Sequence, residues 1–262
     1  MLTTTYQKVN TVGVRDVTRM HALFEANYAF SPLSSFIRDL EKKDGVFIVR
    51  KKSTQEIVGF STLGIYTFKL GGKKVKGLFS GDTIIDKAYW GTRSLQTAVA
   101  FKMFWEAAKN PLTPQYWLLI SKGYKTYLLL SKNFPEYYPK REAVENTQLK
   151  SLVTEYCEAM FPGKLDRESM LLDFGDGANC LKDHVAAITP EMRSEPDIAF
   201  FEQRNPTWQR GTELPCIALA DFKTFAKFIW PFLWKAAFGS KKPARVMADA
   251  SGDVSGPAPH NG

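Results

Sequence analysis

The chain has few residues of the kinds that bind metals or form disulfides. Its 262 residues include three cysteines and three histidines. Cys157, Cys180 and Cys216 are odd in number and lie in no CxxC or Cys/His spacing, so the sequence predicts neither a disulfide framework nor a zinc site. We therefore expect no metal cofactor, and a reducing cytoplasm as the compartment.

Long apolar runs are also missing. The first residues, MLTTTYQKVN, lack the apolar core of a signal peptide, and no stretch reaches the roughly 18 uncharged apolar residues of a membrane-spanning helix. Bulky core material is plentiful, because the chain has 19 Phe, 10 Tyr and 6 Trp. This composition favours one main globular domain with extensions.

The chain is basic, with a net charge of +8 and a pI near 9.2. This charge admits nucleic acid, anionic lipid or an acidic protein as a partner. Lys and Arg are scattered along the sequence and do not cluster with stacking aromatics, and no nucleic-acid-binding motif occurs. We therefore expect no nucleic-acid partner.

Hydrophobic periodicity predicts two helices, a meander of three strands, and then a helix, a strand and a helix. The corresponding residues are 15–29, 31–43, 46–50, 57–70, 75–86, 94–108, 116–121 and 124–134. A helix over 142–160, a strand over 214–219 and a helix over 222–238 follow. We expect a core over 1–141, a helical and strand extension packed on it over 142–220, an amphipathic helix over 221–239 and a disordered tail over 240–262.

The order of elements over residues 15–139 resembles the GCN5-related N-acetyltransferase (GNAT) superfamily. The resemblance implies an α+β fold with a mixed, mainly antiparallel central sheet flanked by helices, to which this chain adds a C-terminal amphipathic helix. It also implies transfer of an acyl group from a thioester donor to an amine or hydroxyl acceptor.

In that superfamily, backbone N–H groups at the start of the helix after the fourth strand bind the donor pyrophosphate. The matching segment here is 86–95, in which Trp90, Arg93 and Leu95 fill motif positions. Such a loop fits acyl-coenzyme A or an acidic acyl carrier protein, which would contact surface bases such as Lys87, Arg93, Lys102, Lys122 and Lys125. The resemblance assigns donor binding to Ile84, Ile85, Lys87, Trp90, Gly91, Thr92, Arg93 and Ser94.

Several side chains are candidates for acid–base chemistry. The superfamily's tyrosine acid would fall at Leu129, and Tyr127 lies two positions earlier, among Tyr124, Tyr137 and Tyr138. His21 lies in the first helix, where this fold builds its acceptor pocket, although a lone helical histidine is more often structural.

Asp82 and Asp86 lie four residues apart on one predicted strand and so share a face. Either carboxylate becomes a general base for the acceptor if burial raises its pKa toward neutrality. The alternative is that Asp86 caps the following turn and that Asp82 pairs with a lysine.

Residues 221–238 carry five Phe, two Trp and three Lys behind Asp221, which is placed as an N-cap. Two arrangements fit this composition. The helix lies in the headgroup region of an anionic membrane on the cytoplasmic face, or it packs on its own domain.

The sequence thus predicts a transferase, an N-acyltransferase of the GNAT kind that uses a long acyl chain carried on coenzyme A or acyl carrier protein. The alternative is a catalytically inactive GNAT-fold module that binds at a membrane surface.

Overall fold

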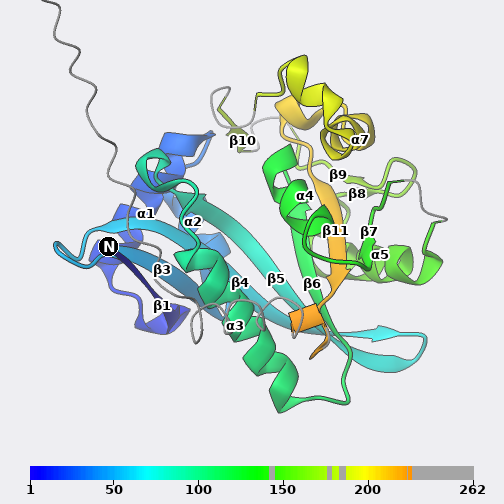
Figure 1. Cartoon of the computed structure of the whole chain (residues 1–262), viewed down its shortest axis with the longest axis horizontal. Coiled ribbons are helices and arrows are strands. Elements are labelled where there is room, and N and C mark those ends of the chain that lie inside the picture. Colours follow the sequence, from blue (N-terminus) through cyan, green and yellow to red (C-terminus); the bar gives the residue numbers. More distant parts are fainter. Residues whose placement is uncertain (142–144, 176–178, 183–186, 223, 226–262) are drawn as a thin grey trace, which may run out of the picture.

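The computed structural model describes residues 1–141, 145–175, 179–182, 187–222 and 224–225. Its centre is a seven-stranded sheet with the order β1-β3-β4-β5-β6-β11-β7 (Figure 1). Every neighbouring pair is antiparallel except β5 and β6, which are parallel. The strands are β1 (Leu2–Lys8), β3 (Gly45–Lys51), β4 (Ile57–Leu70), β5 (Lys73–Ile85), β6 (Gln115–Ser121), β11 (Leu214–Leu219) and β7 (Tyr137–Tyr138).

Helices cover both faces of the sheet, because successive strand residues point to opposite sides. On one side α1 (Val14–Asn27) and α2 (Leu33–Glu41) pack on Val46 and Ile48, and α5 (Thr147–Met160) packs on Phe79 and Leu118.

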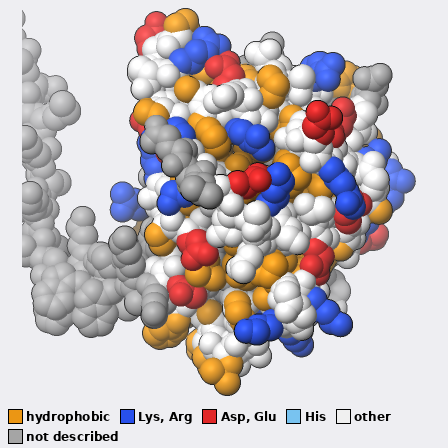
Figure 2. Space-filling view, turned by 90° about the vertical axis from the view of Figure 1, so that its right-hand side faces the viewer, with side chains coloured by type: hydrophobic (Ala, Val, Ile, Leu, Met, Phe, Trp, Pro, Cys, Tyr) orange, Lys and Arg blue, Asp and Glu red, His pale blue; other side chains and the backbone are white. Residues whose placement is uncertain are grey.

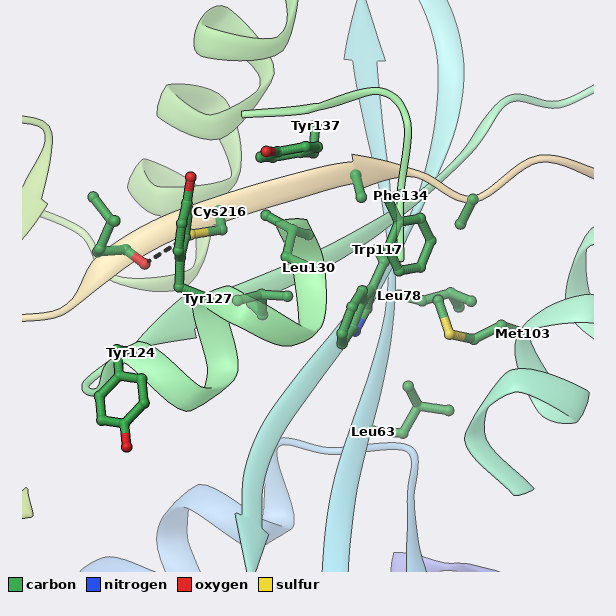
Figure 3. Packing of buried hydrophobic residues seen from close by; sticks show 14 of the residues in the cluster. Leu63, Leu78, Met103, Trp117, Tyr124, Tyr127, Leu130, Phe134, Tyr137 and Cys216 are labelled. Atoms are coloured by element: carbon green, nitrogen blue, oxygen red, sulfur yellow. Dashed lines mark hydrogen bonds between the residues drawn. The ribbon is translucent and has the colours of Figure 1, made fainter. Parts of the chain in front are cut away.

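The other side of the sheet is covered by α3 (Ser94–Lys109), α4 (Tyr124–Ser131) and α7 (Pro196–Arg204). These helices contribute to one large cluster with Leu78, Trp117 and Cys216, part of which is drawn in Figure 3.

Short elements complete the fold. Two two-stranded sheets pair β10 (Cys180–Leu181) with β2 (Tyr28–Ala29) and β8 (Leu165–Asp166) with β9 (Leu171–Leu172). The 3-10 helices are η1 (Val9–Thr11), η2 (Lys87–Tyr89), η3 (Glu191–Ser194) and η4 (Trp208–Arg210). Among the helices that the structure describes, none combines the length and the apolarity needed to cross a bilayer.

The predicted order of helices and strands is confirmed, and so is the α+β fold with a mainly antiparallel sheet. β4 and β11 have the predicted bounds. The sequence missed β1, a Thr-rich edge strand that pairs along its whole length with β3. β11 lies between β6 and β7, so residues 142–220 complete the sheet as well as pack on it. Most of 221–239 and all of 240–262 lie outside the described residues.

A buried carboxylate ties the C-terminal turn of α3 to the sheet. Glu106 binds Lys76 of β5 at 2.5 Å and Lys102 and Lys109 of its own helix at 3.1 Å each. Its side chain is 8% exposed. Burial alone would raise the pKa of Glu106, but the hydrogen bonds from the three ammonium groups lower it to about 2. The carboxylate therefore stays ionised across the physiological range.

We expect Glu106→Gln to destabilise the protein by roughly 1.5 to 3 kcal/mol at pH 7, the range for a hydrogen bond to a charged group. Because the folded-state pKa of Glu106 lies below its unfolded value, its contribution is present above the unfolded pKa of about 4.5 and is lost as the pH falls toward 2. Denaturant unfolding at several pH values checks this. If the difference in unfolding free energy between wild type and Glu106→Gln stayed the same from pH 7 to pH 2, the prediction would be wrong.

Candidate active site

The central feature is an opening between the two parallel strands. The β5–β6 ladder runs from Lys76↔Gln115 to Ser80↔Leu119 and ends there. Beyond that point β5 stays paired with β4 as far as Ile85, and β6 stays paired with β11 as far as Ser121. The strands therefore separate past Ser80, and the inner edge of β5 has no ladder partner there among the described residues.

A β-bulge in β5 accompanies the separation. Ser61 pairs with Thr83 and Leu63 pairs with Ser80, so Thr62 alone faces both Gly81 and Asp82. An extra residue of this kind bends its strand and increases the local twist. A side chain at Gly81 would overlap Thr62 Oγ1 and would lie 3.0 Å from Lys43 Cε, which explains the glycine.

Asp82 follows this glycine and stands at the opening. It is partly buried, and no hydrogen bond or ion pair to it is found among the described residues. Burial and the nearby Asp39 carboxylate raise the pKa of Asp82 to about 7, while Lys43, Lys122 and Glu213 act on it to a smaller extent. A carboxylate that titrates near neutrality suits general base catalysis.

Two ion pairs flank Asp82. Lys43, between α2 and β3, binds both oxygens of Asp39 at 2.8 Å and lies over the Phe79 ring at 5.4 Å. Lys122, directly after β6, binds Glu213 at 2.7 Å. Burial raises the pKa of Glu213, and the Lys122 ammonium opposes that rise.

Lys122 also donates to Asn179 Oδ1 at 2.6 Å and to the Asn179 carbonyl at 2.9 Å, and it lies 6.0 Å from the Tyr28 ring. Tyr28 pairs with Leu181 in the small β2–β10 sheet. Burial, together with the Asp82 and Glu213 charges, raises the pKa of Tyr28 well above its usual value. Tyr28 is therefore a protonated hydroxyl near Asp82.

Asp86, the second carboxylate of the predicted pair, has a local role. Its side chain accepts a hydrogen bond from the Ala88 backbone N–H at 3.0 Å and caps η2. This matches the capping alternative for Asp86. Asp82, in contrast, has no lysine within ion-pair distance in the described structure.

The predicted donor loop runs from the end of β5 to the start of α3. Ile84 is buried, Trp90 donates from Nε1 to the Ile85 carbonyl at 2.8 Å, and Thr92 Oγ1 donates to the Tyr89 carbonyl at 2.9 Å. Gly91 has a φ of 83°, which favours glycine. Lys87 is exposed, and Lys125 lies 4.1 Å from the Trp90 ring centroid.

The start of α3 borders a surface pocket lined by Tyr89, Thr92, Arg93 and Ser94 together with Met1, Leu2, Lys51 and Ser53. Arg93 occupies the N-cap without a capping side-chain hydrogen bond, and the buried Ser94 Oγ has no partner among the described residues. The first N–H groups of a helix favour an anion, so this pocket can accept a phosphate.

Tyr127 does not face the opening. Its side chain is fully buried and donates to the Pro139 carbonyl at 3.0 Å. Figure 3 shows it pointing into the core beside Tyr137 and Cys216. Tyr124, Tyr137 and Tyr138 are also at most 8% exposed. The Tyr127 hydroxyl is therefore engaged inside the core, and Tyr127 is not part of the proposed site.

His21 lies on α1 and contacts α2 and the residues just before it. Nε2 donates to the Ser31 carbonyl at 2.8 Å, and the ring packs on Phe36 with centroids 5.5 Å apart. These contacts match the structural reading of a lone helical histidine.

Sequence reasoning overlooked Lys43, Glu213 and Tyr28, and it treated Lys122 only as a surface base. Lys122 follows the apolar strand β6 and Glu213 precedes β11, and an antiparallel partner brings these two ends together. The placement of polar residues at the ends of apolar strands was the available signal. No pattern along the chain, however, pairs residue 122 with residue 213.

No family model and no curated protein matches the chain. Solved structures similar to it include a conserved protein of unknown function from Enterococcus faecalis, at 14% identity and TM-score 0.37 over 52% of this chain and 34% of that one. A GNAT family N-acetyltransferase from Escherichia coli in complex with CoA has 11% identity and TM-score 0.36, over 52% and 69%.

Saccharomyces cerevisiae N-myristoyltransferase with bound myristoyl-CoA has 15% identity and TM-score 0.33, over 46% of this chain and 31% of that one. The chain thus spans about a third of the length of the yeast and Enterococcus proteins. These identities and TM-scores identify no reaction or substrate, so function rests on the geometry of the opening.

We expect Lys122→Met to destabilise the protein by roughly 3 to 5 kcal/mol, because it leaves Glu213 buried without its partner. It also removes a cation that lowers the pKa of Asp82, so the Asp82 titration should move to higher pH. Thermal unfolding and carboxyl NMR measure the two effects. Lys132→Met is the control, since Lys132 is 53% exposed and lies 3.8 Å from Glu195, and it should change stability by at most about 1 kcal/mol. Equal losses of stability in Lys122→Met and Lys132→Met would contradict the buried Lys122–Glu213 ion pair.

Proposed function

We propose that this protein is an acyltransferase that moves an acyl group from an acyl-CoA thioester to an amine or hydroxyl acceptor bound at the β5–β6 opening. The observation that carries the proposal is Asp82, which stands at the bulge where the strands separate and has a pKa raised to about 7. Most surface carboxylates are fully ionised at that pH and are weaker bases.

The proposed step is direct attack on the thioester. Asp82 takes a proton from the acceptor ammonium or hydroxyl, and the freed lone pair attacks the thioester carbonyl carbon. A carbon–nitrogen or carbon–oxygen bond forms, the carbon–sulfur bond breaks, and the thiolate leaves. The thiolate takes up the second proton of an ammonium acceptor or, with a hydroxyl acceptor, the proton that Asp82 accepted. We place the protonated Tyr28 hydroxyl beside the reacting groups, because the Asp82 charge contributes to the raised pKa of Tyr28.

The proposed donor site extends from the opening to α3. Unpaired backbone groups on the inner edge of β5 can hydrogen-bond the amide groups of an extended donor arm, as a peptide adds to an open sheet edge. The uncapped start of α3, with Thr92, Arg93 and Ser94, offers N–H groups and one cation to the donor phosphates. Lys125 lies over the Trp90 ring, and burial together with the charge of the nearby Lys87 lowers the pKa of Lys125.

We extend the proposal to long acyl chains and to acyl carrier protein as a second donor. The aromatic residues of 221–238 support a long chain, and the exposed Lys87 and Arg93 beside the donor loop support an acidic carrier. Thiol release from coenzyme A and carrier-protein thioesters of increasing chain length ranks these donors. A rate of thiol release that falls steadily as the acyl chain lengthens would reject the preference for long chains.

We also propose peripheral association with an anionic membrane through residues 221–238. Asp221 accepts hydrogen bonds from Thr224 N at 2.8 Å and Thr224 Oγ1 at 2.7 Å, which supports a capped helix start at the predicted position. A catalytically inactive module at that surface is the alternative, and the absence of the superfamily's tyrosine at Leu129 favours it.

The charge on one face of the molecule gives no support to nucleic-acid binding. On the face seen in Figure 2, Lys and Arg side chains alternate with Asp and Glu, and they form no continuous basic band. A basic stripe is the usual footprint of phosphate-backbone binding.

The decisive variant is Asp82→Asn. If Asp82 is the base, the rate of thiol release should fall by roughly 10² to 10⁴-fold. The wild-type rate should rise as the pH passes through about 7, because the carboxylate form of Asp82 is the active one, and this limb should vanish in the variant. The measurement is acceptor-dependent thiol release across pH 5 to 9.

Asp86→Asn is the matched comparison, because asparagine keeps a capping oxygen and Asp86 faces Ala88. It should keep the wild-type rate and its pH limb. A large loss in Asp86→Asn with a normal Asp82→Asn would move the base to Asp86. No turnover with any donor would leave the inactive binding module.

A further inference from the structure

The solvent-facing side of α3 carries an apolar stripe. Phe101 and Trp105 are 61% and 52% exposed, and Leu112, just beyond the helix, is 97% exposed. Phe101, Trp105 and the exposed Ala108 follow the spacing that puts side chains on one face of a helix. The inward side of the same helix buries Leu95, Met103 and Ala107.

The last described part of the chain adds to this stripe. Phe104 contacts Phe222 at 5.3 Å and Phe225 at 6.4 Å between ring centroids. Phe225 is buried in the large core cluster, but Phe222 remains 56% exposed. We call Phe101, Trp105, Ala108, Leu112 and Phe222 together the α3 face.

Cations border the α3 face. Three lysines bind the single carboxylate of Glu106, so this cluster keeps a net positive charge while Glu106 stays ionised. Lys109 is 49% exposed and lies 6.0 Å from the Trp105 ring centroid. Lys76 and Lys102 are only 14% and 20% exposed, so Lys109 is the lysine of this cluster that reaches solvent beside Trp105. An apolar aromatic strip with this positive border suits a partner that is apolar inside and anionic at its surface.

We propose that the α3 face inserts at the boundary between headgroups and acyl chains of an anionic bilayer. Exposed Trp and Phe with adjacent Lys are the side chains that suit this boundary. The inference rests on the membrane association proposed above for residues 221–238, and it supplies a second contact surface on the folded domain.

The charge of the chain's own continuation disfavours the nearest alternative. Residues 226–238 contain Lys227 and Lys235 and no Asp or Glu. If this segment covered the α3 face, it would bring two more cations to the lysines around Glu106. Anionic headgroups instead neutralise that cluster, so the charges favour lipid.

The test is flotation of the full chain with vesicles of phosphatidylglycerol and phosphatidylcholine, and with phosphatidylcholine alone. The double variant Phe101→Ser/Trp105→Ser should lower partition onto the anionic vesicles at least about tenfold, because two aromatic contacts with the acyl region are lost. Val14→Ser is the control: Val14 is 83% exposed at the start of α1 and should float as the wild type does.

A chain ending at Phe225 separates the two proposed contacts. It should bind the anionic vesicles more weakly than the full chain, and the double substitution should weaken it further. Equal flotation of wild type and double variant in both lengths would overturn the proposal. If the double substitution and the truncation lower the melting temperature non-additively while flotation stays unchanged, the α3 face binds the chain's own C-terminal residues and the lipid proposal is wrong.

Turnover is measured in parallel with a soluble short-chain acyl-CoA. Lost flotation with normal thiol release in the double variant supports the α3 face as a lipid contact apart from the chemistry. Normal flotation of a wild-type protein that releases thiol from none of the coenzyme A or carrier-protein donors rejects the acyl transfer and leaves the α3 face as a lipid contact.

Discussion

The bulge at Gly81 and Asp82 is the constraint on which the rest of the site depends. An extra residue in β5 opposite Thr62 marks the point where β5 and β6 part, while each strand keeps its outer neighbour. The ladders on either side hold the opening in place, because β5 remains tied to β4 and β6 to β11. The same backbone feature places Asp82 at the opening, where the inner edge of β5 has no ladder partner among the residues that the structure describes.

Electrostatics around the opening follow from burial and from two ion pairs. Three carboxylates lie around the opening. Asp39 is bound to Lys43 and Glu213 to Lys122, whereas Asp82 has no ion-pair partner among the described residues. Burial and the Asp39 charge then raise the pKa of Asp82 toward neutrality, and the two lysines limit the rise. The two ion pairs hold their own elements together and also set the pKa of Asp82.

The opposite side of the molecule shows a contrasting use of charge. Glu106 is held by three lysines, and its pKa falls to about 2, so the cluster is insensitive to physiological pH. It fixes α3 to β5 and leaves the outer face of α3 apolar with a cationic border. Donor chemistry at the start of α3 and lipid contact along its length would therefore use different parts of one helix.

The sequence by itself determined the order of elements, because hydrophobic period and turn residues act locally. β4 and β11 were predicted with their observed bounds, and Gly71 and Gly72, both with positive φ, marked the hairpin between β4 and β5. It failed at β1, whose three consecutive threonines give a weak strand signal until β3 supplies a partner.

Only the tertiary structure decided which polar residues meet. Asp82 and Asp86 looked equivalent on one strand, yet Asp82 lies at the bulge inside β5, whereas Asp86 follows the end of β5 and caps η2. The pairing of Lys122 with Glu213 joins residues far apart in sequence through the β6–β11 ladder, and Tyr127 was sent inward by the packing of α4. Contacts of this range depend on strand pairing and core packing, which no local pattern encodes.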